Sequence, residues 1–410
     1  MSSSLDAQWK LWYLRAALVA GAAAAAAAGE TNGSLNTDID PDTGLEPGTH
    51  RDRPLVGINY FAGWWTGAGD KWRQPWNSSV DWRVLYPERV PLLGAYNSQE
   101  TMDAEITAAA DAGVDFFQIL WYDDHPERAP NARLLNRGVS EFMASPNSSR
   151  MRFFIEWCNS APLFNVSSDE DWITMVHEDW LPAFRHPSYL RVGGALVFKV
   201  ISAGGFLKNG CGMNHTLAEA RWQMLRDAVR EAGLGEMIIG AGQAAPDKDE
   251  VEWWANGQYN WTGLYCAVDH DDPAYTGHVL PWKNESEFVN VNRQQHAQTS
   301  AAAGVPFLPM VVSGWDPRPW REKRASFAFP TDAEWEAELE TVKTQLAPGG
   351  TPNFGLPLPN GEVQPAFNIY AWNEFGEGGM MAPTQGWKYK RLEAITKVFG
   401  KRRATSLHEI

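Results

Sequence analysis

The sequence is short of cysteine and of positive charge, and it has no long run of large apolar residues. Its three cysteines, Cys158, Cys211 and Cys266, are far apart and form no CxxC pair, which argues against a zinc or iron–sulfur site. At most one disulfide can form, with Cys211 and Cys266 as a suggested pair. The 35 basic and 50 acidic residues give a formal net charge of -15. This charge repels nucleic acids and anionic membrane surfaces, so we expect a soluble enzyme that binds no nucleic acid.

Several cofactor and nucleophile motifs are also absent. There is no GxGxxG or GxxxxGK[ST] loop for a dinucleotide or a phosphate, and no GxSxG elbow for a serine hydrolase. Two polar clusters, residues 123–125 (DDH) and 269–272 (DHDD), carry oxygen and imidazole groups. Neither cluster has the spacing of a calcium-binding loop or the HExxH pair of a zinc helix. We therefore expect no cofactor and no metal ion.

The N-terminal residues differ in composition from the rest of the chain. Residues 1–29 combine two basic side chains with a run of small apolar residues, which is typical of a secretory signal, with a signal anchor as the alternative. Residues 30–52 are polar and rich in turn signals, which predicts a flexible linker before a catalytic domain at 53–400 and a basic tail at 401–410. We expect a secreted or secretory-pathway monomer that touches a membrane only if the N-terminal segment stays uncleaved. Seven N-x-S/T sequons agree with this route, at Asn32, Asn77, Asn147, Asn165, Asn214, Asn260 and Asn284.

Beyond the linker, short apolar runs alternate with helical patterns. Eight strands alternating with about eight helical segments predict an α/β fold, a (β/α)8 TIM barrel with extended loops at the carboxyl ends of the strands. A doubly wound open sheet is the alternative, because periodicity does not show whether the sheet closes. The predicted strands are 55–60, 114–121, 151–158, 195–201, 237–241, 263–268, 305–312 and 366–372. The predicted helices are 97–113, 131–144, 171–184, 216–232, 285–303, 331–346 and 386–399, with capping-box starts at Asn97/Glu100 and Thr331/Glu334.

Carboxylates, amides and aromatic rings recur at the ends of the predicted strands. In a barrel these ends meet at one mouth, where active sites lie. Aromatic faces stack on sugar rings and carboxylates accept hydrogen bonds from sugar hydroxyls, so the pattern predicts a carbohydrate ligand. The expected substrate-binding residues are Tyr60, Trp64, Trp121, Tyr122, Asp123, Glu156, Asn159, Asp269, Trp315, Asp316, Trp372 and Asn373.

The most informative stretch is residues 364–383, QPAFNIYAWNEFGEGGMMAP. An apolar run ends at Trp372 and presents Asn373, Glu374 and Glu377 just where glycines begin. Two carboxylates three residues apart suit general acid and base chemistry, so we expect Glu374 and Glu377 to be catalytic. A strand end followed by a solvated, glycine-rich turn is the structural alternative. We expect the two carboxylates to face the same cleft as Glu156, Trp121 and Tyr60.

With these motifs in place, the chain resembles the glycoside hydrolase family 99 and 99-like group, which contains endo-α-mannosidases and their bacterial relatives. The similar segments are VGINYFAGWW, PLLGAYNSQETMDAEITAAADAGVDFFQILWY, FRHPSYLRVGGALVFKV and WNEFGEGGMMAP, in this order within residues 54–399. The resemblance implies that Glu374 acts as base and Glu377 as acid, and that Glu156 and Tyr60 match family site residues. Two departures concern substrate specificity: the mannosidases have His where this chain has Gly376, and the family often has Glu where it has Ala382.

The resemblance also implies a mechanism. One Glu removes the proton of the sugar 2-hydroxyl, the sugar oxygen attacks its own anomeric carbon, and the other Glu protonates the departing oxygen, with retention of configuration. We expect a glycoside hydrolase that cleaves O-glycosyl bonds in an oligo- or polysaccharide. A glycosyltransferase or transglycosidase acting on glycans, and a non-catalytic glycan-binding barrel, are the alternatives.

Overall fold

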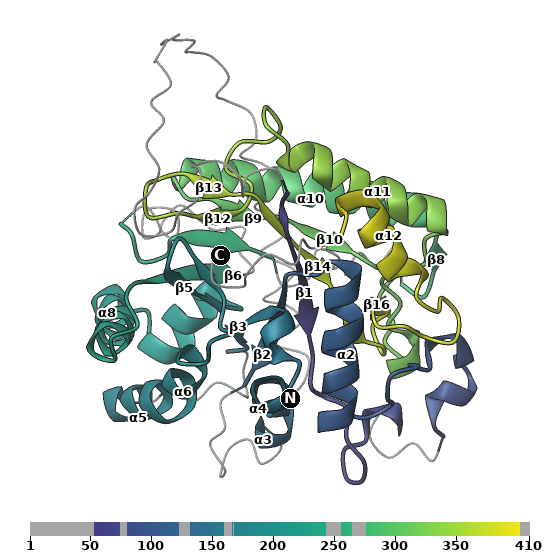
Figure 1. The fold of residues 1–410 in the computed structure, drawn as a ribbon, viewed down its shortest axis with the longest axis horizontal. Coiled ribbons are helices and arrows are strands. Elements are labelled where there is room, and N and C mark those ends of the chain that lie inside the picture. Colours follow the sequence, from purple (N-terminus) through teal and green to yellow (C-terminus); the bar gives the residue numbers. More distant parts are fainter. Residues whose placement is uncertain are drawn as a thin grey trace.

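The computed structural model shows a closed (β/α)8 barrel (Figure 1), and it describes residues 53–73, 80–122, 132–159, 166, 168–242, 256–264 and 276–401. Every neighbouring pair of barrel strands is parallel, and the last strand, β14, pairs with the first, β1. The sheet therefore closes, which confirms the barrel and excludes the open doubly wound sheet. The barrel strands are β1 (Leu55–Tyr60), β2 (Phe116–Trp121), β3 (Arg152–Trp157), β5 (Ala195–Val200), β6 (Met237–Gly242), β7 (Trp261–Gly263), β9 (Phe307–Leu308), β10 (Met310–Val312) and β14 (Ala366–Tyr370).

The seventh barrel strand is split into β9 and β10 by Pro309. Proline has no N–H to donate to the ladder, so the strand is interrupted there. Its carbonyl still accepts a hydrogen bond from the N–H of Asn368 at 2.9 Å, which joins this strand to β14. β9 pairs with β7 on one side and β10 pairs with β14 on the other, so the two short pieces together complete the barrel.

Helices surround the barrel on its outer side. In Figure 1, α10, α11 and α12 lie together along one side, and α5, α6 and α8 along another. The α-helices are α2 (Gln99–Ala112), α3 (Ala132–Leu135), α4 (Arg137–Ala144), α5 (Asp169–Thr174), α6 (Leu181–Phe184), α7 (Ala203–Gly205), α8 (His215–Glu231), α10 (Trp282–Ala302), α11 (Asp332–Leu346) and α12 (Lys390–Phe399). Short 3-10 helices are η1 (Lys71–Arg73), η2 (Trp82–Val84), η3 (Pro87–Arg89), η4 (Ser148–Arg150) and η8 (Arg318–Trp320), and π-helical turns are η5 (Met175–Trp180) and η6 (Phe206–Gly210).

Short strands outside the barrel ladder shape its loops. The antiparallel pair β15 (Asn373–Glu374) and β16 (Gly379–Met380) follows β14 directly. The other short strands are β4 (Arg191–Val192), β8 (Val279–Leu280), β11 (Ser326–Phe327), β12 (Leu356–Pro357) and β13 (Val363–Gln364). The pair β15 and β16 is the structural form of the NExxEG motif.

The helix starts expected from capping boxes are confirmed at one position and wrong at another. Thr331 and Glu334 form a reciprocal capping box at the start of α11. Helix α2 is capped by Ser98, whose hydroxyl accepts from the N–H of Thr101. Asn97 cannot cap it because its Oδ1 accepts from the N–H of Trp64 at 2.8 Å.

Several expectations fall on segments outside the described residues. These are the signal or anchor (1–29), the linker (30–52), nearly all of the basic tail (401–410), Asp123, Asp269 and Cys266. Cys211 is buried with a free thiol. Within the described segments, every helix is too short or too polar to cross a membrane.

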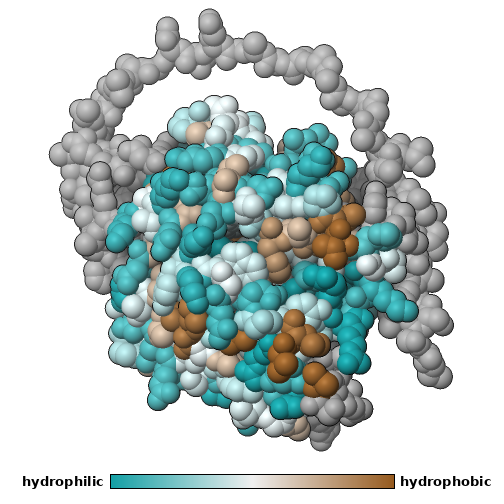
Figure 2. Space-filling view, turned by 90° about the vertical axis from the view of Figure 1, so that its right-hand side faces the viewer, coloured by the Kyte–Doolittle hydropathy of each residue, from teal (hydrophilic) through white to brown (hydrophobic). Residues whose placement is uncertain are grey.

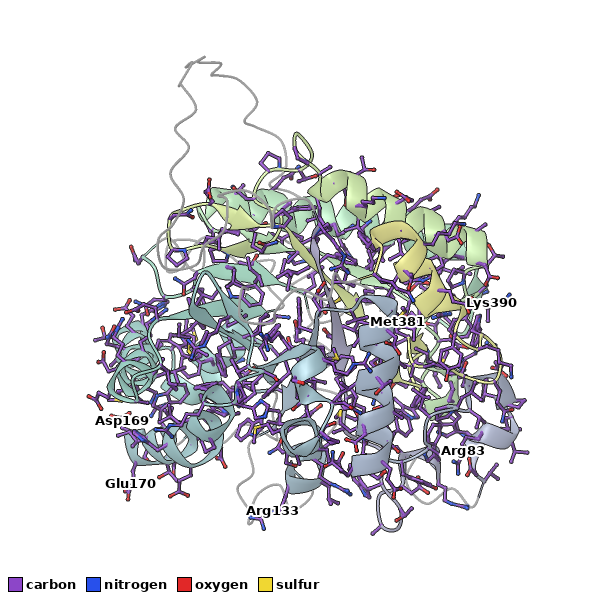
Figure 3. All side chains as sticks on the ribbon, viewed as in Figure 1. Arg83, Arg133, Asp169, Glu170, Met381 and Lys390 are labelled. Carbon is purple, nitrogen blue, oxygen red and sulfur yellow. The ribbon has the colours of Figure 1, made fainter. Side chains whose placement is uncertain are left out.

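Side chains alternate between the barrel interior and the layer beneath the helices, as parallel strands require. The buried core is continuous and rich in tryptophan, with Trp64, Trp157 and Trp372 among its largest members. Met381 lies inside, whereas Asp169 and Lys390 lie at the outside of the helices that carry them (Figure 3). Figure 2 shows one face on which hydrophilic residues dominate and hydrophobic ones form small separate patches.

Candidate active site

Glu374 and Glu377 project from one tight turn at the carboxyl end of β14. The N–H groups of Glu377 and Gly378 both donate to the carbonyl of Glu374, at 3.0 and 2.9 Å. Gly378 has φ +94°, and a Cβ there would lie 2.6 Å from the backbone nitrogen of Asp316. That nitrogen donates to the carbonyl of Glu377 at 2.6 Å. The glycine therefore lets the turn close against the loop after β10, which fixes both carboxylates at the strand ends.

Glu374 is a buried carboxyl group with one oxygen, Oε2, that lacks a hydrogen-bond donor among the described residues. It is 4% exposed, and no described residue donates to its Oε2. Burial raises the pKa of Glu374 well above its usual range, the charge of Glu377 raises this pKa further, and the ammonium of Lys71 opposes the rise. An unpartnered acceptor in a buried site is costly, so this oxygen is suited to a donor that a ligand brings.

Glu377 is less buried and better supported as an anion. Burial raises the pKa of Glu377 overall, although the guanidinium of Arg324 and a hydrogen bond from the Tyr370 hydroxyl to Oε2 oppose the rise. The pKa of Glu374 is raised more strongly, which favours the proton on Glu374. A Glu374 base and a Glu377 acid need the opposite order at the start of a reaction.

Lys71 is a site residue that the sequence did not reveal. It lies in η1, in the loop after β1, where no motif marks it. Its Nζ lies 5.2 Å from the ring centroids of both Phe61 and Trp320. Burial lowers the pKa of Lys71 overall, although the charges of Glu374 and Glu377 oppose this effect. The site therefore contains two carboxyl groups and one ammonium group.

Trp64 and Asn373, both expected to bind substrate, hold the catalytic turn in place. The indole N–H of Trp64 donates to the carbonyl of Asn373 at 2.8 Å, and the N–H of Phe61 donates to the Asn373 Oδ1 at 2.8 Å. The Trp64 ring is 1% exposed and packs 4.1 Å from Trp72 and 5.2 Å from Phe375, measured between ring centroids. These contacts tie the loop after β1 to the turn after β14.

Glu156 lies in the barrel interior within a polar network. Its Oε1 pairs with the ammonium of Lys199 at 2.6 Å, and its Oε2 accepts from the amide of Gln118 at 2.6 Å. The oxygen of Gln118 in turn accepts from the Asn368 amide at 3.0 Å. All four side chains are buried and come from four barrel strands. Both oxygens of Glu156 therefore contact protein groups, Oε1 through an ion pair and Oε2 through a hydrogen bond.

Tyr122 links this network to the catalytic turn. Burial raises its pKa well above the usual range, and the charges of Cys158, Glu374 and Glu156 raise it further. Its phenol therefore lies within electrostatic reach of both Glu374 and Glu156. The structure thus brings together three residues expected from the sequence: Tyr122, Glu156 and Glu374.

Tyr60, Trp121 and Trp372 face away from this site. The Tyr60 hydroxyl donates to Glu105 of α2 at 2.8 Å, and Trp121 packs edge to face on Trp180 of η5. Trp372 packs 5.1 Å from the ring of Phe117, between the barrel and its helices. The expectation that these rings face the carboxylates is corrected. Tyr60 and Trp121 point outward because adjacent residues of a strand point to opposite faces. Trp372 lies beyond the end of β14, and its packing on Phe117 places it in the outer layer. They belong to the layer beneath the helices.

The remaining expected residues stabilise loops. The Asn159 side chain donates to the carbonyl of Ser202 at 2.8 Å and accepts from its N–H at 3.0 Å, which links two strand ends. Asp316 is 1% exposed and pairs with Arg89 and Arg318; burial raises its pKa, but these partners outweigh burial and lower it overall.

Trp315 is also buried and lies beside the site. It is 2% exposed, its ring centroid is 6.0 Å from that of Tyr370, and the Arg324 guanidinium lies 4.6 Å above it. Tyr370 and Arg324 both act on Glu377, so Trp315 packs beneath the groups that support this carboxylate.

The structure gives a reason for the glycine at position 376, where the resembled mannosidases have His. A Cβ at this position would lie 2.1 Å from Cε2 of Trp320. The Trp320 indole, carried by η8, therefore occupies the volume that a side chain at position 376 would need. The mouth of this chain is thus shaped by an aromatic ring from the loop after β10.

Other features of the described residues do not offer a competing site. No cluster of three or more His, Cys, Asp or Glu side chains suited to a metal ion occurs among them. A surface hollow of about 560 Å³ lies between α8 and residues 256–258, and it shares no residue with the carboxylate site. The catalytic chemistry of this fold is expected at the strand ends, so we base the candidate site on the carboxylates.

Comparisons with known proteins agree with the fold. Neither a protein-family model nor a curated protein matches the sequence. A solved chain described as a glycoside hydrolase-like protein matches with TM-score 0.56 at 12% identity, over 90% of this chain and 97% of that one. A GH99 endo-α-mannosidase from Bacteroides thetaiotaomicron matches with TM-score 0.48 at 14% identity, and the match covers 84% of this chain and 95% of that one. The exo-β-1,4-mannosidase Op5Man5 from Opitutaceae bacterium strain TAV5 matches with TM-score 0.45 at 12% identity, and the match covers 90% of this chain and 62% of that one. The first of these matches shows that the chain shares its α/β-barrel fold with a glycoside hydrolase-like protein.

Proposed function

We propose that this protein is a glycoside hydrolase that cleaves O-glycosyl bonds in an oligo- or polysaccharide. The observation that carries the proposal is the pair of carboxyl groups, Glu374 and Glu377, on one turn at the carboxyl end of β14. Two carboxyl groups in different environments are the usual equipment for glycosidic cleavage. The fold shared with glycoside hydrolase structures supports the same class.

The proposed mechanism retains configuration through the sugar 2-hydroxyl. Glu374 acts as base on that hydroxyl, the resulting oxygen attacks the anomeric carbon, and Glu377 gives its proton to the departing oxygen. Water then opens the intermediate with the two roles reversed. Both carboxyl groups lie on one turn, which suits this route because neither has to attack from the face opposite the leaving group.

Substrate binding would shift the charges toward these roles. A sugar hydroxyl that donates to Oε2 of Glu374 supplies the partner that this oxygen lacks and stabilises its anion. The same sugar removes water from the half-buried Glu377, which makes its proton harder to lose. Substrate binding thereby reverses the order of the two pKa values.

The test is a digest of diverse oligo- and polysaccharides, followed by kinetics with aryl glycosides of the sugar released. We expect Glu377→Gln to abolish turnover of substrates with poor leaving groups and to spare activated aryl glycosides, because only the former need a proton. Glu374→Gln should lower the turnover of both kinds of substrate, by about 10³-fold. Glu287→Gln, at an exposed position of α10, is the matched control and should leave both rates unchanged.

Other outcomes would overturn parts of the proposal. Equal losses on both substrates in Glu377→Gln contradict the acid assignment, and sparing of activated substrates in Glu374→Gln would exchange the two roles. Product formation only with an added activated sugar donor would indicate a transferase. Unchanged glycan binding without any turnover would indicate a binding protein.

A further inference from the structure

The backbone around Lys71 is anchored to the catalytic turn by aromatic contacts. The indole N–H of Trp82 donates to the carbonyl of Lys71 at 2.8 Å. The adjacent Trp72 donates to the carbonyl of Ala95 at 2.7 Å and stacks 5.4 Å from Phe375, which lies between Glu374 and Gly376 in the chain. The position of Lys71 relative to the two carboxyl groups is therefore built into the fold.

The ammonium of Lys71 is held between two aromatic rings. Its Nζ lies 5.2 Å from the centroids of Phe61 and of Trp320, within the range of a cation–π contact. Trp320 is itself fixed by its close approach to Gly376. No described residue accepts a hydrogen bond from the Lys71 ammonium, so its charge remains available to the site. Because Trp320 lies against Gly376 and Trp72 stacks on Phe375, these ring contacts place the ammonium next to the turn that carries Glu374 and Glu377. The charges of both carboxyl groups act on the pKa of Lys71 in agreement with this placement.

We propose that Lys71 is a positioning residue of the catalytic pair: its ammonium stabilises the single negative charge that Glu374 and Glu377 share during turnover. The inference rests on the proposed function. Two close carboxyl groups resist simultaneous ionisation, and a nearby cation offsets this repulsion. One carboxylate is then available as base near neutral pH while the other keeps its proton.

Other charged or titratable groups face the pair from the elements around it. Arg324 and Glu322 act on Glu377 from the loop after β10, and Tyr370 donates to it from β14. Tyr122 lies beside Glu374, with Glu156 behind it in the barrel. All of these groups are retained when Lys71 is replaced, so a Lys71 variant reports on the ammonium alone.

The first experiment compares pH profiles of kcat/KM for the wild type, Lys71→Met and Lys71→Arg. Removing the cation destabilises the ionised pair, so both limbs of the Lys71→Met profile should move to higher pH by about 1 unit. Lys71→Arg keeps the charge and should retain the wild-type limbs. Lys323→Met removes an equal charge from an exposed position on the loop after β10 and should not move them. A higher KM in Lys71→Met with unmoved limbs would make Lys71 a substrate contact and overturn the proposal.

The second experiment needs no turnover. Carboxyl groups of ¹³C-labelled glutamate are titrated by NMR in the wild type, Lys71→Met and Lys71→Arg, with Glu374→Gln and Glu377→Gln to assign the signals. We expect the assigned titrations to move to higher pH only in Lys71→Met. Unmoved titrations in a folded Lys71→Met protein would overturn the inference. Moved titrations in a protein that cleaves no glycoside would uphold it and refute the proposed function.

Discussion

Glu374 and Glu105 are both buried acids beside the same two barrel strands, but they lie on opposite sides of the barrel wall. Glu105, on α2, accepts from the Tyr60 hydroxyl at 2.8 Å. Burial raises its pKa to about 7, an effect that the nearby Trp372 indole and the hydrogen bond from Tyr60 oppose. Glu374 has an unpartnered oxygen and a neighbouring ammonium instead. A raised pKa alone therefore does not distinguish the candidate site from a structural carboxyl group. What distinguishes Glu374 is an unpartnered oxygen at the carboxyl ends of the strands.

The largest expected difference between the two acids is in catalysis, and it is tested by replacing each of them with glutamine. We expect Glu374→Gln to lower kcat/KM by about 10³-fold, since general base catalysis contributes on this scale. Glu105→Gln should leave kcat/KM nearly unchanged, because its partners are structural. The measurement uses one glycoside and one pH for both variants. A comparable loss in Glu105→Gln would abolish the distinction between the two regions.

The raised pKa of Glu105 should make the free energy of unfolding depend on pH. The folded pKa of Glu105 is raised to about 7, so between its unfolded value and this pKa the folded state binds more protons than the unfolded state. Its contribution to stability is thus complete at low pH and is lost as pH rises. The loss amounts to about 3 kcal/mol between about pH 4.5 and pH 8.

In Glu105→Gln this titration is absent. Between the two pH values, the free energy of unfolding of the variant should therefore fall by about 3 kcal/mol less than that of the wild type. Urea unfolding of both proteins at the two pH values measures the difference. Glu287→Gln, on the exposed face of α10, controls for the loss of a carboxylate and should follow the wild type. Parallel curves for wild type and Glu105→Gln would show that Glu105 is ionised in the folded protein.

Gly376→Ala tests the packing around Glu374, at the carboxyl ends of the barrel strands. The new methyl group would clash with Trp320, 2.1 Å away, so we expect a loss of about 2 kcal/mol in unfolding free energy. A Gly376→Ala/Trp320→Ala protein should lose less than the sum of the two single changes, because the clash partner is gone. Thermal or urea unfolding of the three variants gives the coupling. Additive losses would contradict the contact between these residues.

Much of the fold and part of the candidate site could be predicted from the sequence. The alternation of apolar runs and helical patterns predicted the barrel, which the structure confirms, and the NExxEG spacing predicted the turn that carries the two candidate carboxyl groups. Orientation was harder, since Tyr60, Trp121 and Trp372 sit at strand ends as expected but face the helices. Lys71 could not be predicted, because its position depends on aromatic contacts between segments far apart in the chain.

The smallest expected effect concerns Tyr60, which the resemblance placed in the site and the structure places beneath α2. Tyr60→Phe removes the donor to Glu105 and the acceptor of the Asn97 amide, at 2.8 and 3.1 Å. We expect a loss of about 1 kcal/mol in unfolding free energy, the usual net value of such a bond, with kcat/KM unchanged. In a Glu105→Gln background Tyr60→Phe should cost less, because the bond to an ionisable partner is already weakened. A lowered kcat/KM in Tyr60→Phe at full stability would instead return Tyr60 to the active site, and the wall between the two acids would no longer separate structure from catalysis.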